Sequence, residues 1–147
     1  NQFAQFALSV SQRRAEPLTL GWLDLDHFKT INDRFGHQEG DKALKAMAAL
    51  MRSSFREADM LVRFGGDEFA VIMSGTPADN ALAAMARVHE RLVNMPLHGA
   101  PMARLCISVG VAPWGAQFTH YREWLKAADV ALYKAKNAGR GRTEVAA

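Results

Sequence analysis

The stretch that decides the fold is Arg63–Met73, RFGGDEFAVIM, in which two glycines and two carboxylates stand between apolar runs. The flanking segments Met60–Phe64 and Phe69–Met73 have the composition of strands. A glycine pair between them predicts a β-hairpin, because glycine adopts positive φ without steric cost. Asp67 and Glu68 at the tip supply the hard oxygen ligands that Mg²⁺ prefers. Most such turns are only solvated, so the rest of the chain must decide whether this one is a site.

Composition sets broad limits on the protein. The chain has 147 residues, 49% of them hydrophobic, which predicts one domain over residues 1–147 with enough apolar side chains for a core. No apolar run approaches the ~18–20 residues of a membrane span, and Asn1–Leu8 lacks the basic start of a signal peptide. The lone Cys106 excludes an internal disulfide and fits a reducing compartment. We therefore expect a cytoplasmic domain without membrane contact.

Apolar periodicity predicts helices that alternate with strands. The run after Pro17 is apolar on both faces, as in a central strand that is buried on both sides. Thr76 is expected as a helix N-cap with Pro77 in the first turn. Together these features predict an α/β (α+β) domain with a mixed central β-sheet flanked by helices. The expected helices are Asn1–Arg14, Gly40–Phe55, one opened by Thr76-Pro77, and Tyr121–Asn137 closed by Gly139; the expected strands are Leu18–Leu25, Met60–Phe64, Phe69–Met73 and Met102–Ala112.

A second group of acids follows the first predicted strand. Asp24 and Asp26 fall on the same face if the strand alternates strictly, and ligands gather where strands end. Two neighbouring acids either bind a metal or are well hydrogen-bonded, since a bare pair would repel. The alternative is that Asp26 and Asp33 are only turn and cap residues, which is common for aspartate.

The spacing of this region resembles a known family. The pattern D-x-D-x-F-K-x-I-N-D-x-x-G-H-x-x-G-D-x-x-L runs from Asp24 to Leu44 without a gap, and the Gly65-Gly66-Asp67-Glu68-Phe69 signature follows. Both resemble GGDEF domains, the diguanylate cyclases that join two GTP molecules into cyclic di-GMP. The resemblance implies a palm-like, ferredoxin-related nucleotide-cyclase core that carries the hairpin.

The resemblance also implies roles for individual residues. Asp24 would be shared by two Mg²⁺ (or Mn²⁺) ions per GTP site, with the carbonyl of Leu25 as a backbone ligand. Asp67 would be the opposing ligand and the base, with Glu68 adjacent to the metals.

The guanine base has its own set of residues in the family pattern. Asn32 and Asp41 would read it, with His37 close to the substrate; a carboxylate can accept from guanine N1–H and the 2-amino group, which adenine does not offer. Asp41 could equally be an acid favoured at a helix N-terminus, and a lone histidine such as His37 is more often a turn residue.

The basic C-terminal segment fits a phosphate clamp. The stretch from Ala128 to Arg142 resembles the family's closing A-D-x-A-L-Y-x-A-K-x-x-G-R-N-R pattern, with Gly141 in place of the usual Asn. By that match Lys136 and Arg140 would hold the β- and γ-phosphates, with Lys29 helping. A solvated basic tail is the alternative.

Arg56 and Asp59 have the spacing and offset of the family's inhibitory R-x-x-D site for product. A guanidinium fork can bind the phosphate or the guanine Hoogsteen edge of cyclic di-GMP, and the aspartate can accept from guanine N1–H. The alternative is a plain i,i+3 ion pair.

Three functions can be weighed on this basis. The first is a diguanylate cyclase in which two facing copies each hold one GTP and the 3′-hydroxyl of one attacks the α-phosphate of the other. The second is a catalytically silent receptor for cyclic di-GMP. A nucleic-acid-binding domain would need exposed aromatics between basic residues, whereas the aromatics here have core spacing, so no nucleic-acid partner is expected. The resemblance further implies that an N-terminal sensory or receiver domain is missing.

Overall fold

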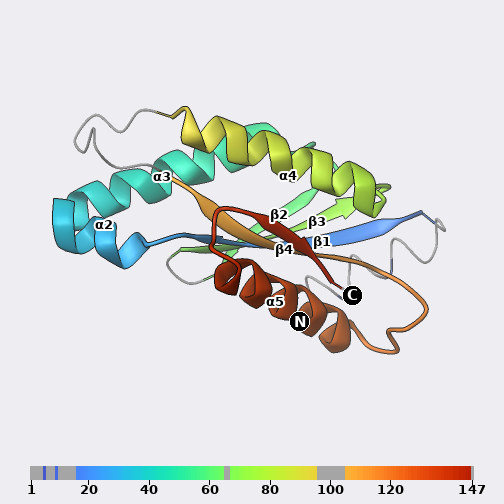
Figure 1. Cartoon of the computed structure of the whole chain (residues 1–147). Helices are drawn as coiled ribbons and strands as arrows, with labels where there is room; N and C mark the ends of the chain where they lie inside the picture. Colours follow the sequence, from blue (N-terminus) through green and yellow to red (C-terminus); the bar gives the residue numbers. More distant parts are fainter. Residues whose placement is uncertain (1–4, 6–8, 10–15, 65–66, 96–104, 147) are drawn as a thin grey trace.

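The computed structural model describes residues 5, 9, 16–64, 67–95 and 105–146 of the chain. They form a mixed five-stranded sheet in the order β2-β3-β1-β4-β5 (Figure 1), with antiparallel pairs except for the parallel pair of β4 and β5. Helices α3 and α4 cover one face of the sheet and α5 covers the other, which makes an α+β fold. The elements are β1 (Leu18–Leu25), α2 (Phe28–Phe35), α3 (His37–Ser54), β2 (Met60–Phe64), β3 (Glu68–Ser74), α4 (Ala78–Val93), β4 (Ile107–Pro113), α5 (Tyr121–Asn137) and β5 (Thr143–Val145).

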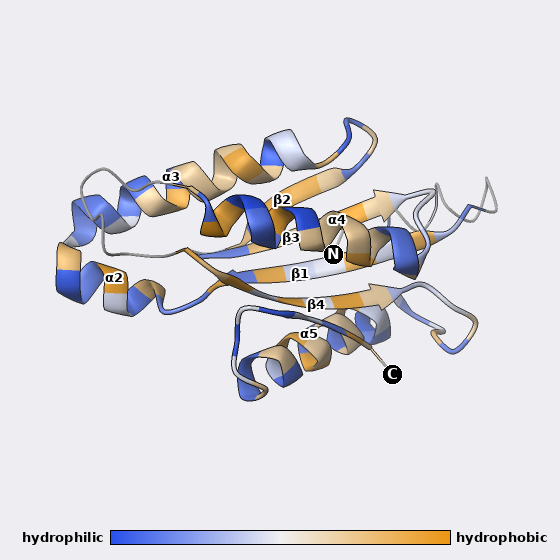
Figure 2. Ribbon diagram, turned by 45° about the horizontal axis from the view of Figure 1, so that its top comes forward, coloured by the Kyte–Doolittle hydropathy of each residue, from blue (hydrophilic) through white to orange (hydrophobic). Residues whose placement is uncertain are grey.

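The central strand β1 divides the core into two layers. Leu23 and Leu25 pack with α3 and α4, whereas Leu18 and Leu20 pack with α5. This alternation follows from the two-residue period of a strand and confirms a strand buried on both faces. Asp24 has the same parity as Leu18 and Leu20, so its side chain belongs to the face covered by α5. Figure 2 shows hydrophobic residues along the strands, while the helices carry both hydrophobic and hydrophilic residues.

Helix α5 is held tightly against the sheet. Trp124 is fully buried and its indole N–H donates to the carbonyl oxygen of Ala112 over 2.7 Å. A Cβ on Gly110 would lie 2.1 Å from the carbonyl oxygen of Ala128, so only glycine permits this approach. Loss of the indole would cost about 3–5 kcal/mol. This packing fixes where the C-terminal end of α5, with Lys136, meets the end of β1.

Several predicted elements have the expected bounds. Strand β1, strand β2 and helix α5 begin and end where the sequence predicted, and α5 ends before Gly139, which has φ +120°. The predicted helix over Asn1–Arg14 lies outside the described residues, apart from Gln5 and Ser9, which are helical. The described part of the strand predicted over Met102–Ala112 begins only at Ile107, and residues 102–104 lie outside the described part.

The region after β1 was predicted wrongly in one respect. Helix α2 was not expected, because it lacks the usual start signals: its N-cap His27 is left-handed (φ 56°), makes no side-chain cap bond, and no acid follows in the first turn. Tertiary packing stabilises it instead, through buried Ile31 and the partly buried Phe28 and Phe35.

Two other boundaries differ from the prediction. Helix α3 begins at His37 and not at Gly40, which lies inside it. Thr76 does not cap α4: the N-cap is Pro77, and the Thr76 hydroxyl donates to the carbonyl oxygen of Ser74. The short edge strand β5 was also missed.

Candidate active site

The acid pocket is a hollow of about 290 Å³ at the end of β1. Its lining includes the two sequence-predicted metal acids, the predicted backbone ligand Leu25 at the end of β1, and all three predicted phosphate-binding side chains. The residues that line it are Asp24, Leu25, Asp26, His27, Phe28, Lys29, Thr30, Asp67, Lys136 and Arg140. Three segments distant in sequence therefore contribute to one pocket.

Asp24 is buried at this pocket and only partly neutralised. The ammonium of Lys136, which is close to the end of α5, donates to its Oδ2. The other oxygen, Oδ1, is buried and accepts no hydrogen bond from the part of the chain that the structure describes. A buried carboxylate oxygen without a partner is costly, so it is a position where a cation would be stabilising.

Asp67 lies beside Asp24, directly before the first residue of β3. Its carbonyl oxygen accepts from the N–H of Leu25 over 3.1 Å, which ties the hairpin to the end of β1. Burial, and next the negative charge of Asp24, raise the pKa of the Asp67 carboxyl. The charge of Asp24 therefore disfavours the ionised form of Asp67, as expected for carboxylates that share a site.

The donor set fits a hard divalent cation. No group of three or more His, Cys, Asp or Glu side chains gathers within the described residues. Mg²⁺ nevertheless binds through one or two carboxylates, completing its shell with water and substrate phosphates. Two adjacent carboxylates, one with an unpartnered oxygen, meet this requirement. The carbonyl of Leu25 as a third protein ligand stays a prediction.

Glu68 lies near these acids but lines a different hollow. It is paired directly with Asp24 in the register of β1 and β3. The hollow that it lines also includes Trp22, Leu125 and Lys126. A role for Glu68 at the metals stays a prediction.

The predicted guanine-binding residues gather on α2 and α3. The Oδ1 of Asn32 packs so closely on Gly40 that a Cβ there would lie only 1.7 Å from it. Asp41 is the next residue, while His37 begins α3, and both are exposed. Among the described residues, the lining of the acid pocket does not include Asn32, His37 or Asp41. The structure thus brings the Asn32 side chain against Gly40, the residue before Asp41. Both Asn32 and Asp41 are close in sequence to the acid-pocket residues, but neither lines that pocket.

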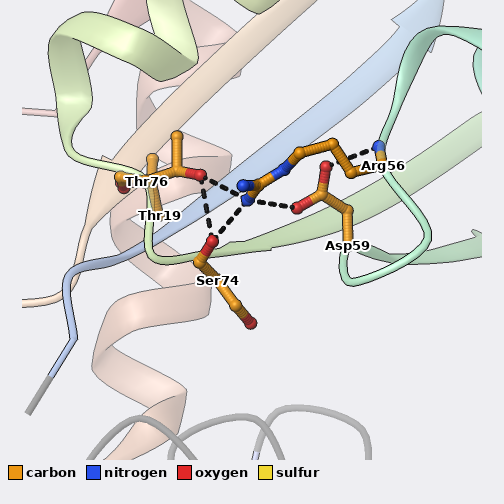
Figure 3. A network of polar contacts seen from close by, with 5 residues as sticks. All are labelled: Thr19, Arg56, Asp59, Ser74 and Thr76. Atoms are coloured by element: carbon orange, nitrogen blue, oxygen red, sulfur yellow. Dashed lines mark hydrogen bonds and ion pairs between the residues drawn. The ribbon is translucent and has the colours of Figure 1, made fainter. Parts of the chain in front are cut away.

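A second hollow, the arginine pocket, has about 310 Å³ and is lined by Arg56, Asp59, Asn80 and Arg87 among others. Figure 3 shows that the guanidinium bonds of Arg56 meet at one nitrogen, Nη2. Its guanidinium donates to Asp59 Oδ1 (3.1 Å), to Thr76 Oγ1 (2.9 Å) and to the carbonyl oxygen of Ser74. The Asp59 side chain is only 4% exposed, whereas that of Arg56 is 59% exposed, so the acid of this pair is buried and its guanidinium is largely open to solvent.

Sequence reasoning missed the part played by Asp26. Its side chain makes no cap bond to α2; it accepts from Ser108 Oγ on β4 and from the N–H of Gly141 after α5. The D-x-D alternation was the available signal, because it places Asp26 on the same face as Asp24. Ser108 carried no signal of its own.

The fold and the acid pocket define an α+β domain of the nucleotide-cyclase palm type, and the comparisons name the family. The model of the family described as diguanylate cyclase, GGDEF domain, matches residues 1–142. The chain belongs to the GGDEF family.

Relatives and solved structures agree. The chain is 57% identical over 136 residues to the probable diguanylate cyclase DgcC of Escherichia coli K12, covering 92% of this chain and 37% of that protein. The active GGEEF domain of a Vibrio cholerae diguanylate cyclase superposes with a TM-score of 0.90 at 29% identity, covering 96% of this chain and 90% of that one. The GGDEF domain of DgcB from Caulobacter crescentus, solved in complex with c-di-GMP, gives 0.90 at 25% identity, covering 99% and 86%.

The chain spans little more than a third of the length of the Escherichia coli relative. Within the described residues, every helix is too short or too polar to pass through a bilayer.

Proposed function

We propose that this domain is a diguanylate cyclase that condenses two GTP molecules into cyclic di-GMP and releases pyrophosphate. The observation that carries the proposal is the pair of adjacent carboxylates, Asp24 and Asp67, beside Lys136 and Arg140 in one pocket. Acids next to bases suit a metal-bound triphosphate, because the acids hold the cation and the bases hold the anion. The family membership and the name of the Escherichia coli relative support the same activity.

Asp24 and Asp67, with the carbonyl of Leu25, would hold Mg²⁺ (or Mn²⁺), two ions per GTP site. A bound metal would lower the pKa of the attacking 3′-hydroxyl and offset negative charge on the phosphoryl oxygens. Asp67 would also be the base that takes the proton of the attacking 3′-hydroxyl. Glu68, directly across from Asp24, would assist as an adjacent acid.

The phosphates would be bound by Lys29, Lys136 and Arg140. Lys136 pairs with Asp24, so its ammonium must turn from this acid towards a β- or γ-phosphate when the nucleotide binds. Arg140 lies after the end of α5, and Lys29 is exposed on α2, on the other side of the pocket. Three cations arranged in this way can neutralise most of a triphosphate's charge.

The guanine base would lie over the start of α3. Asn32 and Asp41 offer an amide and a carboxylate close together, and these can satisfy the donors and acceptor on the guanine edge. His37 would contact the substrate from the first turn of α3. Joining two GTP molecules takes two such sites, which a second copy of the domain would supply by facing the first.

Product feedback would act through the arginine pocket. Arg56 and Asp59 would bind cyclic di-GMP there, with Arg87 on α4 adding a second guanidinium to the wall. The Caulobacter crescentus neighbour was solved with c-di-GMP, which supports product binding by this fold. The guanidinium bonds of Arg56 all come from Nη2, so product could add bonds at the remaining N–H donors or replace those to Ser74 and Thr76.

The test is incubation of the domain with GTP and Mg²⁺, followed by chromatography of the nucleotides. We expect cyclic di-GMP and pyrophosphate, a rate per domain that rises with protein concentration, and no product with ATP or with a chelator. Asp67→Asn serves as the matched control. If the unmodified domain binds cyclic di-GMP but forms none at any protein concentration, with either Mg²⁺ or Mn²⁺, it is a receptor and the proposal is wrong.

A further inference from the structure

Asp26 is a buried charge in contact with three parts of the chain. Asp26 as a whole residue is only 4% exposed. Oδ1 accepts from the hydroxyl of Ser108 over 2.6 Å, and Oδ2 accepts from the N–H of Gly141 over 2.9 Å. Its own N–H donates to the carbonyl oxygen of Cys106 over 2.8 Å. Both carboxylate oxygens are thus engaged by donors, in contrast to Asp24, whose Oδ1 is not.

The segment tied down by Asp26 has an unusual backbone. Gly139, Arg140 and Gly141 all have positive φ, at 120°, 65° and 57°. For the two glycines this conformation is free of steric strain, but for Arg140 the Cβ disfavours it. Such a residue keeps its conformation only where the surroundings over-determine it.

The surroundings supply several bonds to this segment. The N–H of Arg140 donates to the carbonyl oxygen of Ala135 over 3.0 Å. The N–H of Val109 donates to the carbonyl oxygen of Arg142 over 2.9 Å. The Asp26–Gly141 bond is the one that comes from the end of β1. It therefore links the Arg140 turn to the strand that carries Asp24.

We propose that Asp26 is a positioning residue for the nucleotide's triphosphate, and this rests on the proposed function. By accepting the Gly141 N–H while Ser108 fixes its orientation, Asp26 holds the left-handed turn that presents Arg140 to the acid pocket. It contacts neither metal nor substrate. Its effect is confined to the part of the ligand that Arg140 would bind, the β- and γ-phosphates.

The alternative is that Asp26 only stabilises the fold. The two roles differ in ligand dependence. A loss of general stability would weaken the binding of every nucleotide equally, whereas a displaced Arg140 would weaken binding only of nucleotides that have the outer phosphates. Comparing a triphosphate with GMP separates the two.

The experiment is calorimetric titration of Asp26→Asn and the unmodified domain, each with Mg²⁺, using 3′-deoxyGTP and GMP. The deoxy analogue lacks the attacking hydroxyl, so no turnover disturbs the titration. An amide keeps the volume but carries no charge and offers one acceptor oxygen, so the bond from the Gly141 N–H is either lost or reduced to a weaker neutral one. We expect affinity for 3′-deoxyGTP to fall about tenfold and affinity for GMP to stay within about twofold. Asp79→Asn, an exposed acid on α4, should change neither.

Two further variants sharpen the result. In an Arg140→Ala background, Asp26→Asn should lower the affinity for 3′-deoxyGTP no further, because the positioned group is gone. Ser108→Ala removes only the bond that orients Asp26. We therefore expect the ratio of the affinity for 3′-deoxyGTP to the affinity for GMP to fall about twofold to threefold. Ser108→Ala also decides the question if Asp26→Asn fails to fold.

The outcomes are distinct. Unchanged affinities for both nucleotides in Asp26→Asn and in Ser108→Ala overturn the positioning role and leave the proposed function intact. An equal loss for both nucleotides also overturns it, in favour of a structural role. An unmodified domain that binds 3′-deoxyGTP no better than GMP counts against the proposed phosphate clamp itself, and with it against the triphosphate as the group that Asp26 serves.

Discussion

The acid pocket and the arginine pocket are of similar size, about 290 and 310 Å³, but differ in how their charges are satisfied. In the acid pocket, two carboxylates lie together, one buried oxygen has no partner within the described residues, and the pKa of Asp67 is raised. In the arginine pocket, one guanidinium donates to three acceptors, and Asp59 accepts from both the backbone and the side chain of Arg56.

The difference separates a site that needs a ligand from one that does not. Carboxylates that repel each other lower the folding stability of the free domain, and a bound cation removes that repulsion. Functional sites commonly lower folding stability in this way. An existing network stabilises the free domain, and a ligand must replace its bonds or add bonds at the remaining donors. We therefore expect metal and substrate to depend strongly on the first pocket, and product to act more weakly through the second.

The largest effect should come from removing one acid of the acid pocket. Asp67→Asn and Asp24→Asn should each lower cyclic di-GMP formation by at least about a hundredfold, because each removes a metal ligand. Chromatography of the reaction with GTP and Mg²⁺ measures this, with Asp79→Asn as the exposed control. Turnover near that of the unmodified domain in either variant would contradict the metal assignment.

Arg56→Ala tests whether the arginine pocket is more than a structural network. We expect the affinity for cyclic di-GMP to fall about tenfold or more, because the charge-assisted bonds of one arginine are worth ~1.5–3 kcal/mol. The initial rate at low product should be nearly unchanged. Calorimetric titration measures the affinity, and Arg52→Ala, an exposed arginine on α3, is the matched control.

The same variant should also lose stability. Asp59, whose side chain is 4% exposed, would keep its bond from the Arg56 N–H but lose its cation. A lower melting temperature with unchanged product affinity would leave the pocket as a structural ion pair without a regulatory role.

Guanine selectivity should depend on Asp41. Losing its acceptor leaves guanine donors unpaired and costs ~1–3 kcal/mol in GTP affinity. The weak affinity for ATP should hardly change, because adenine offers no matching donors. Titration of both nucleotides against Asp41→Ala, with Asp33→Ala on α2 as the control, tests this. If the unmodified domain bound ATP as well as GTP, neither Asp41 nor Asn32 could be a guanine reader.

The smallest effect concerns the stability of the free domain. The pKa of Asp67 is raised above the usual aspartate value of 3.8, so its ionised form costs folding free energy at neutral pH. That cost fades as the pH falls through the raised pKa towards 3.8, and it is absent below. Without metal, Asp67→Asn should therefore melt higher than the unmodified domain at pH 7, by no more than about 4 °C because the group is partly exposed.

Magnesium should reverse this order. Mg²⁺ binds the folded state through both acids, so it should raise the melting temperature of the unmodified domain and leave that of Asp67→Asn almost unchanged. Calorimetric melting from pH 4 to 7, with and without Mg²⁺, records both effects. A variant that melts lower than the unmodified domain at pH 7 without metal would argue against repulsion between the two acids.

The elements that depend on local sequence patterns were predicted well. The bounds of β1, β2 and α5 depend on local periodicity and on glycine, and the sequence contains both. Helix α2 was missed because its stability comes from Phe28, Ile31 and Phe35 packing on the core. The cap role of Thr76 was wrong because its hydroxyl bonds instead to Ser74 and Arg56, which no local pattern reveals.

By itself the sequence determined which residue types stand at the ends of strands and turns, and hence the family and the chemistry expected of it. Only the tertiary structure decided that Asp24, Asp67 and Lys136 share one pocket, that Arg56 bonds to Thr76 as well as to Asp59, and that Asp26 joins β1 to the turn after α5. The reason is physical. Local spacing fixes the direction of a side chain within its own element, whereas contacts between elements depend on strand register and on how closely α5 packs against β4, where Gly110 admits the backbone of Ala128.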